Sequence, residues 1–117
     1  MIVALHSELQ PGTAERYDRE HARIPADLAV SFARVGISEW RIWRSGERLF
    51  HLVECEDFDA AMAALDTDPA NQRWQAQIGA VVRRFSGPEG SEGMSPLVAV
   101  WALSTQREVP LETELPT

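Results

Sequence analysis

Hydrophobic positions along the chain follow two different periods, and each period predicts one kind of element. Residues 2–9, 37–44 and 48–55 are short runs, rich in apolar and β-branched residues, which is typical of strands. The segment 45–47 is a tight, glycine-containing connection between the second and third runs. It predicts a β-hairpin.

Between these runs, apolar residues recur three and four positions apart, which predicts amphipathic helices. The first runs from about residue 13 to residue 21 or 22, and Pro25 ends it and starts a second, because proline lacks the N–H that a helix interior needs. Asp57 and Asp68 are the expected N-caps of two further helices. The apolar stripes of the three later helices are Leu28, Phe32 and Val35, then Phe58, Ala61, Met62 and Leu65, then Trp74, Ile78 and Val81.

The C-terminal part of the chain divides into three segments. Residues 86–96 are rich in glycine, serine and proline, so we expect a flexible connection. Residues 97–103 are apolar throughout and predict the last strand. One domain then covers residues 1–104, and we expect the tail, 105–117, to be extended or disordered.

Taken in order, these elements form a β-α-β-β-α-β pattern with each helical segment broken in two. This is the ferredoxin-like arrangement, an α+β fold with an antiparallel sheet and its helices on one face. The segment 97–103 is apolar on both faces, and Trp40 and Trp43 fall on opposite faces of their strand. Because the helices cover only one face, we expect a second copy of the chain to cover the other, in a homodimer packed sheet to sheet.

The charge and composition exclude several classes of partner. The formal net charge of -7 disfavours nucleic acids and anionic membrane surfaces, which bind clusters of lysine and arginine. No apolar run reaches membrane-spanning length, and residues 1–5 lack the basic region of a signal peptide, so we expect the cytoplasm. The single cysteine, Cys55, lies in an apolar run and is expected to be a buried free thiol.

Tyr17 and His21 are the first candidates for chemistry. They are four residues apart, so a helix places them on one face, one turn from each other. A phenol beside an imidazole can exchange hydrogen bonds and protons, and histidine changes charge near neutral pH without any perturbation. The alternative is structural, with Tyr17 in the core, its hydroxyl at the rim, and His21 partly buried.

Arg73 and Trp74, on the helix that follows Pro69, extend this candidate site. An indole face can stack on the C–H side of a sugar ring, and tyrosine and histidine can bind hydroxyl groups. A small polar ligand with apolar patches, such as a monosaccharide, fits that combination. Trp74 at helical spacing is also compatible with a plain core position.

Other polar residues on the strands carry weaker signals. His6 and His51 lie on the central pair of strands, but spacing places no third ligand beside them, so we expect hydrogen-bonded histidines and no metal. Glu8 and Glu54 are either rim charges or, where buried, groups with a raised pKa. The sequence has no glycine-rich phosphate loop, no GxSxG and no CxxC, which argues against nucleotide-dependent, serine-hydrolase and thiol-redox enzymes. We expect no cofactor.

Together these residues resemble the L-rhamnose mutarotase family. The resemblance covers about residues 3–104 and leaves the tail unmatched. It rests on Tyr17 and His21 within RYDREHARIPADL, on Gly36, on Leu49 and Phe50, on DPANQRW from Asp68 to Trp74, and on the run LVAVWAL. One position departs from the family pattern, because Gln75 stands where a second tryptophan is usual.

The resemblance implies a dimeric α/β barrel with a sugar pocket between sheet and helices. It also implies cofactor-free interconversion of the α and β anomers of a deoxyhexose. By that similarity Tyr17 and His21 are catalytic or contact the substrate, and Trp74, with Arg73 before it, lines the pocket. Gln75 leaves open a ligand that differs from L-rhamnose, such as L-fucose or another pyranose, and it leaves open a loss of the activity.

Two other classes of function stay open. A cofactor-free monooxygenase on the same barrel would bind a flat aromatic or a polyketide, with Trp74, Phe32 and Phe50 around it. A non-catalytic binding or structural module would fill the pocket with its own side chains. The pocket discriminates between them: hydroxyl-binding groups beside a stacking ring favour a sugar, a long apolar slot favours an aromatic, and no cavity favours the module.

Overall fold

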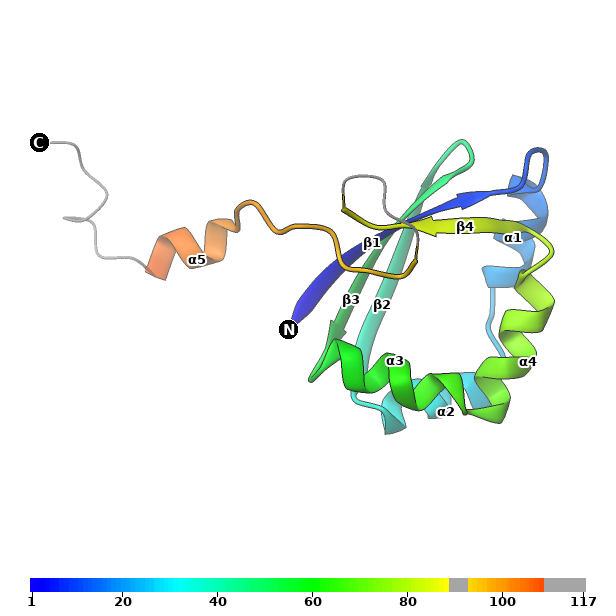
Figure 1. Cartoon of the computed structure of the whole chain (residues 1–117), viewed down its shortest axis with the longest axis horizontal. Coiled ribbons are helices and arrows are strands. Elements are labelled where there is room, and N and C mark those ends of the chain that lie inside the picture. The colour runs from blue at the N-terminus through cyan, green and yellow to red at the C-terminus, as the bar shows by residue number, and fades with distance from the viewer. Residues whose placement is uncertain (89–92, 109–117) are drawn as a thin grey trace, which may run out of the picture.

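A four-stranded antiparallel sheet forms one layer of the molecule. The computed structural model describes residues 1–88 and 93–108, and Figure 1 shows their arrangement. The strand order is β2-β3-β1-β4, so β1 and β3 are the central pair, as the sequence predicts. The strands are β1 (Ile2–Leu9), β2 (Ile37–Ser45), β3 (Arg48–Cys55) and β4 (Val82–Ser86).

Four helices cover one face of this sheet (Figure 1). They are α1 (Ala14–His21), α2 (Ala26–Arg34), α3 (Phe58–Asp66) and α4 (Pro69–Ile78). The first three strands and these four helices confirm the sequence-based prediction, including the break before Pro25. The fold is therefore the expected ferredoxin-like α+β arrangement, with broken helices on one face. No helix among the described residues is long and apolar enough to cross a membrane.

Local sequence explains where the third and fourth helices begin. The Asp57 side chain accepts a hydrogen bond from Ala60 N at 3.0 Å, and so caps α3. The Asp68 side chain accepts one from Asn71 N at 3.0 Å, with Pro69 at the first turn of α4. Each carboxylate satisfies a backbone donor that has no partner within the helix.

The register of the central strands decides which side chains face the helices. Leu5 pairs with His51, and Ser7 pairs with Leu49. All four side chains are buried on the helix-covered face. His6 pairs with Phe50, and because strand side chains alternate, both point to the other face, the outer face of the sheet.

The prediction of the last strand is wrong. The fourth strand is β4, at residues 82–86, where Val82 pairs with Leu9 and Phe85 with Ser7. The consecutive residues Arg83 and Arg84 hide this short strand from an apolar-run search, although Arg84 pairs with Glu8 at 3.0 Å. The helix stripe that we extended to Val81 ends with α4 at Ile78.

The apolar segment 97–103 lies outside the sheet instead. It has no regular structure up to residue 102, and one backbone hydrogen bond, from Leu97 N to Ala4 O at 2.8 Å, ties it to β1. Val100 is 94% exposed and Trp101 is 66% exposed. We call residues 97–108 the arm, and Figure 1 shows it projecting away from the sheet and helices.

The predicted tail differs in its first residues. Residues 105–108 belong to a short helix, α5 (Leu103–Glu108), where the sequence predicts an extended or disordered tail. Residues 109–117 of the tail, and 89–92 of the connection 86–96, lie outside the described residues. The domain boundary at residue 104 stays a prediction.

Candidate functional site

Helix α1 brings Tyr17 and His21 into direct contact. Their rings stack with centroids 3.9 Å apart and an interplanar angle of 27°. Nδ1 of His21 lies 3.1 Å from the backbone carbonyl oxygen of Tyr17. A carbonyl can only accept, so Nδ1 carries the hydrogen of the neutral ring, and Nε2 keeps a free lone pair.

Trp74 completes an aromatic cluster with this pair. It comes from α4, and its ring meets His21 edge-on, with centroids 5.0 Å apart and an angle of 74°. Trp74 and Tyr17 are both buried. Three of the four predicted site residues, Tyr17, His21 and Trp74, therefore lie together.

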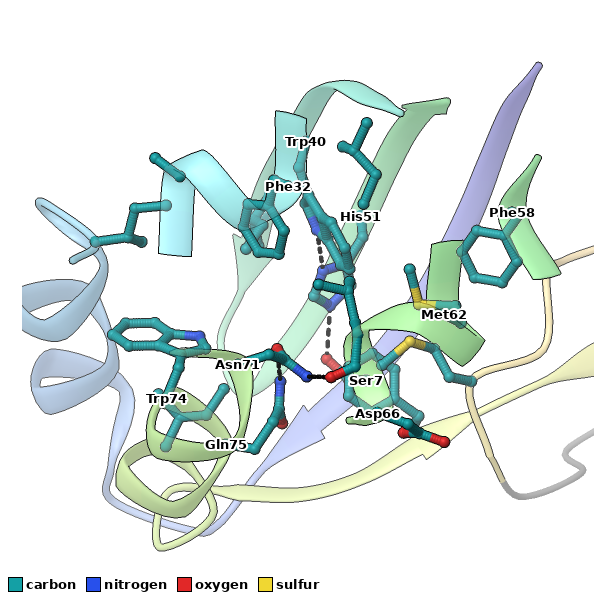
Figure 2. A pocket seen from close by; sticks show the side chains of 18 of the residues that line it. Ser7, Phe32, Trp40, His51, Phe58, Met62, Asp66, Asn71, Trp74 and Gln75 are labelled. Atoms are coloured by element: carbon teal, nitrogen blue, oxygen red, sulfur yellow. Dashed lines mark hydrogen bonds between the residues drawn. The ribbon is translucent and has the colours of Figure 1, made fainter. Parts of the chain in front are cut away.

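These residues line a cavity of about 1000 Å³ between the sheet and the helices. Figure 2 shows Trp74 on one side, Phe58 and Met62 on the other, and His51 with Ser7 between them. Hydrogen-bonding side chains on its walls are Ser7, Tyr17, His21, Ser38, Glu39, Trp40, His51, Asp59, Asp66, Asn71, Trp74 and Gln75. The cavity is thus neither filled by its own side chains nor a purely apolar slot.

Burial sets the protonation of the Tyr17–His21 pair. It raises the pKa of Tyr17 far above the ordinary value, with a smaller contribution from Asp18. It lowers the pKa of His21 below 6.5, partly offset by the hydrogen bond to the Tyr17 carbonyl. Near neutral pH the site therefore presents a phenol that donates and an uncharged imidazole that accepts.

The structure does not bring Arg73 to this cavity. It lies on the outer side of α4, exposed, and pairs with Asp27 of α2. The next residue, Gln75, does line the cavity, and its amide lies 3.4 Å from the Asn71 side-chain oxygen. Gln75, which stands where a second tryptophan is usual, thus presents an amide to the cavity.

His51 is hydrogen-bonded, as the sequence predicts, but its place in a hydrogen-bonded chain on the cavity wall was not predicted. Trp40 Nε1 donates to Nδ1 of His51 at 3.1 Å, and Nε2 of His51 lies 2.8 Å from Ser7 Oγ. Strand alternation was an available signal, because His51 falls between two buried apolar positions of β3, Leu49 and Val53.

The remaining strand residues lie elsewhere. His6 faces the outer side of the sheet and contacts Phe50, so neither it nor Phe50 belongs to the cavity. Glu8 pairs with Arg84, and Glu54 is exposed.

Within residues 1–88 and 93–108, no three His, Cys, Asp or Glu side chains gather in a way that could hold a metal ion. Cys55 is a buried free thiol, as predicted.

Known proteins share both the sequence and the fold. The sequence model of the family described as L-rhamnose mutarotase matches residues 2–103. An L-fucose mutarotase of Xanthomonas campestris pv. campestris is 34% identical over 108 residues, covering 88% of this chain and 85% of that protein. An L-rhamnose mutarotase of Verminephrobacter eiseniae is 30% identical over 96 residues, covering 81% and 89%.

A solved structure agrees with the arrangement of elements. The L-rhamnose mutarotase of Formosa agariphila superposes with a TM-score of 0.70 at 18% identity, over 88% of this chain and 98% of that one. At this identity the likeness is one of fold, and it supports the ferredoxin-like architecture described above.

Proposed function

The chain belongs to the L-rhamnose mutarotase family, and on that premise we propose that it interconverts the α and β anomers of a deoxyhexose pyranose. The observation that carries the proposal is the stacked Tyr17–His21 pair, which lines one cavity together with Trp74 in contact with His21. The imidazole that accepts and the phenol that donates match the base and the acid that anomer exchange needs. The indole ring of Trp74 offers a surface on which a sugar ring can stack.

Ring opening needs one proton removed and one supplied. His21 Nε2 takes the proton of the anomeric hydroxyl, whose oxygen becomes the aldehyde oxygen. The electron pair of the bond between the anomeric carbon and the ring oxygen moves to the ring oxygen, which takes the Tyr17 proton. Rotation of the aldehyde and the reverse transfers close the ring as the other anomer and restore both side chains.

The environment of the pair suits this sequence. Burial disfavours a charge on either group alone, as the raised pKa of Tyr17 and the lowered pKa of His21 indicate. A phenolate and an imidazolium formed together, with their rings stacked, stabilise each other while the sugar is open. Both groups are neutral again once the ring has closed.

The cavity favours a sugar over the other two classes. Among the described residues, the Tyr17 hydroxyl and the Trp74 indole N–H have no hydrogen-bond partner, so both are free for ligand hydroxyls. A flat apolar substrate would leave these donors unpaired in a buried site, at a free-energy cost. A structural module would need no cavity of this size.

The outer face of the sheet supports a homodimer. Trp43 is 52% exposed and Phe50 is 42% exposed on adjacent strands, and they pair across β2 and β3. The arm adds further exposed apolar side chains, including Trp101. We infer that a second copy covers this face, because monomers rarely expose so many large apolar groups together. The cytoplasmic location stays a prediction.

The direct test follows anomeric protons by exchange NMR, with L-rhamnose and with L-fucose. Protein at catalytic concentration is expected to speed α/β exchange above the spontaneous rate for at least one sugar. Comparing the two sugars ranks them and shows which one the cavity with Gln75 accepts. If neither rate rises above the protein-free control, the proposed activity is refuted.

A further inference from the structure

Two tryptophans line the cavity in different hydrogen-bonding states. The Trp74 indole N–H has no partner among the residues that the structure describes, whereas the Trp40 N–H donates to His51 Nδ1 at 3.1 Å. Trp74 therefore offers a ligand both a ring face and a donor. Trp40 offers a ring face alone.

His51 accepts the hydrogen bond of the Trp40 N–H and leaves no donor of its own free for a ligand. An indole N–H can only donate, so Nδ1 of His51 accepts, and the neutral ring carries its hydrogen on Nε2. Nε2 donates in turn to Ser7 Oγ at 2.8 Å, and Ser7 is fully buried. Since Nε2 is a donor, it cannot take a proton from Ser7, so the pair is not a hydrolase dyad.

Burial keeps this arrangement intact near neutral pH. It lowers the pKa of His51 to about 4, with smaller contributions from His21 and His6. The ring is thus uncharged under ordinary conditions, and Nδ1 stays available as an acceptor. Figure 2 shows the chain from Trp40 through His51 to Ser7.

Two apolar side chains lie beside the Trp40 ring in the cavity wall. Phe32 of α2 stacks on it, with centroids 5.6 Å apart and an angle of 27°. Ile42 follows on the same face of β2, and all three side chains line the cavity and are only partly buried. We call Trp40, Phe32 and Ile42 the Trp40 wall. These three side chains have no hydrogen-bonding group left for a ligand.

We propose that the Trp40 wall is the subsite for the methyl group of the deoxyhexose, and that His51 is a positioning residue that keeps this wall apolar. The inference rests on the proposed mutarotase function. The C6 methyl is the one apolar substituent of such a sugar, and the matching hexose carries a hydroxymethyl there. Against the Trp40 wall, that extra hydroxyl would lose water and gain no hydrogen bond from the three side chains of the wall.

The test compares sugars that differ only in the C6 hydroxyl. The pairs are L-fucose with L-galactose and L-rhamnose with L-mannose, and the readout is the ratio of their kcat/KM values for anomer exchange. An apolar pocket discriminates against an added hydroxyl by up to about 100-fold. We therefore expect the kcat/KM ratio to favour the deoxy sugar by roughly 10- to 100-fold.

Matched variants separate the polarity of the wall from its packing. Phe32→Leu and Phe32→Gln both remove the ring, but only glutamine brings a donor and an acceptor to the wall. His51→Leu frees the Trp40 N–H, whereas His51→Gln keeps an acceptor and a donor in its place. We expect the deoxy preference to fall several-fold in Phe32→Gln and His51→Leu, and to persist in Phe32→Leu and His51→Gln.

Each outcome decides something different. Anomer exchange with no deoxy preference in the unaltered protein overturns the inference and leaves the proposed function standing. An equal fall of the ratio in all four variants also overturns it, because a packing defect would then explain the effect. No exchange with any of the four sugars overturns the proposed function and, with it, the subsite.

Discussion

At the residue scale, one backbone carbonyl decides what His21 can do. The Tyr17 carbonyl holds the hydrogen of His21 on Nδ1, so the nitrogen that remains free is a base and not an acid. The same ring stacks on the Tyr17 phenol, which burial keeps protonated. The roles in the proposed mechanism therefore follow from local geometry within α1.

Removal of the imidazole is expected to abolish most of the activity. His21→Ala should lower the enzyme-catalysed exchange rate by a factor on the order of 100 or more, as loss of a general base usually does. The measurement is anomeric exchange NMR at matched protein concentration. Arg19→Ala, on the exposed side of the same helix, is the control and should exchange like the unaltered protein. A His21→Ala rate equal to the control would remove His21 from the mechanism.

The pH profile should report the lowered pKa of His21. The neutral ring is the active form, so kcat/KM is maintained above its pKa and falls as acid protonates Nε2. Because burial lowers that pKa below 6.5, the fall should have its midpoint below pH 6.5. The profile is measured against the protein-free rate at each pH. A midpoint above 6.5 would contradict the neutral-base assignment.

At the element scale, α4 is placed by contacts at its first turn. The Asp68 carboxylate caps α4 through Asn71 N at 3.0 Å, and it also accepts from Ser31 Oγ of α2 at 2.9 Å. One side chain thus starts the helix and ties it to its neighbour. Because the first turn of α4 is held in place, the position of Trp74 in the cavity wall is held as well.

Removal of this cap should cost stability without changing the chemistry. Asp68→Ala loses the cap and the ion pair with Arg34, and it leaves the buried Ser31 hydroxyl without its partner, so we expect the melting temperature to fall by about 5 °C or more. Asp57→Ala is the matched control, because it loses a cap alone. We expect a smaller decrease there. Thermal unfolding followed by circular dichroism gives both values, and an equal decrease would show that the contacts of Asp68 with Ser31 and Arg34 add nothing to the cap.

At the scale of the whole molecule, the apolar surface is unevenly distributed. The helix-covered face of the sheet is buried, while the outer face and the arm expose the large apolar side chains Trp43, Phe50 and Trp101. A second copy packed on the outer face would bury Trp43 and Phe50 without altering the cavity on the opposite side of the sheet.

A charge on the outer face should therefore separate the proposed dimer. Light scattering at micromolar concentration is expected to give twice the chain mass for the unaltered protein and the chain mass for Trp43→Glu, because an unpaired charge would be buried at the interface. Val30→Glu places the same charge on an exposed apolar position of α2 and should leave the dimer intact. A monomeric unaltered protein would refute the homodimer.

Some features followed from the sequence because they depend on neighbours in the chain. Tyr17 and His21 are one helical turn apart. Asp57 and Asp68 each cap the helix that begins at the following residue. Such local rules need no knowledge of the rest of the fold. The hydrophobic periods likewise predicted three strands and four helices, and hence the ferredoxin-like order.

Only the tertiary structure decided the rest, because it depends on contacts between distant segments. Ser7 and His51 are 44 positions apart, and they meet only through the register of β1 and β3. Arg73 and Trp74 are adjacent, yet α4 turns one outward and the other into the cavity. The last strand was mispredicted for the same reason. The apolar sequence of residues 97–103 favours burial, but packing decides whether such a segment enters its own sheet or remains exposed.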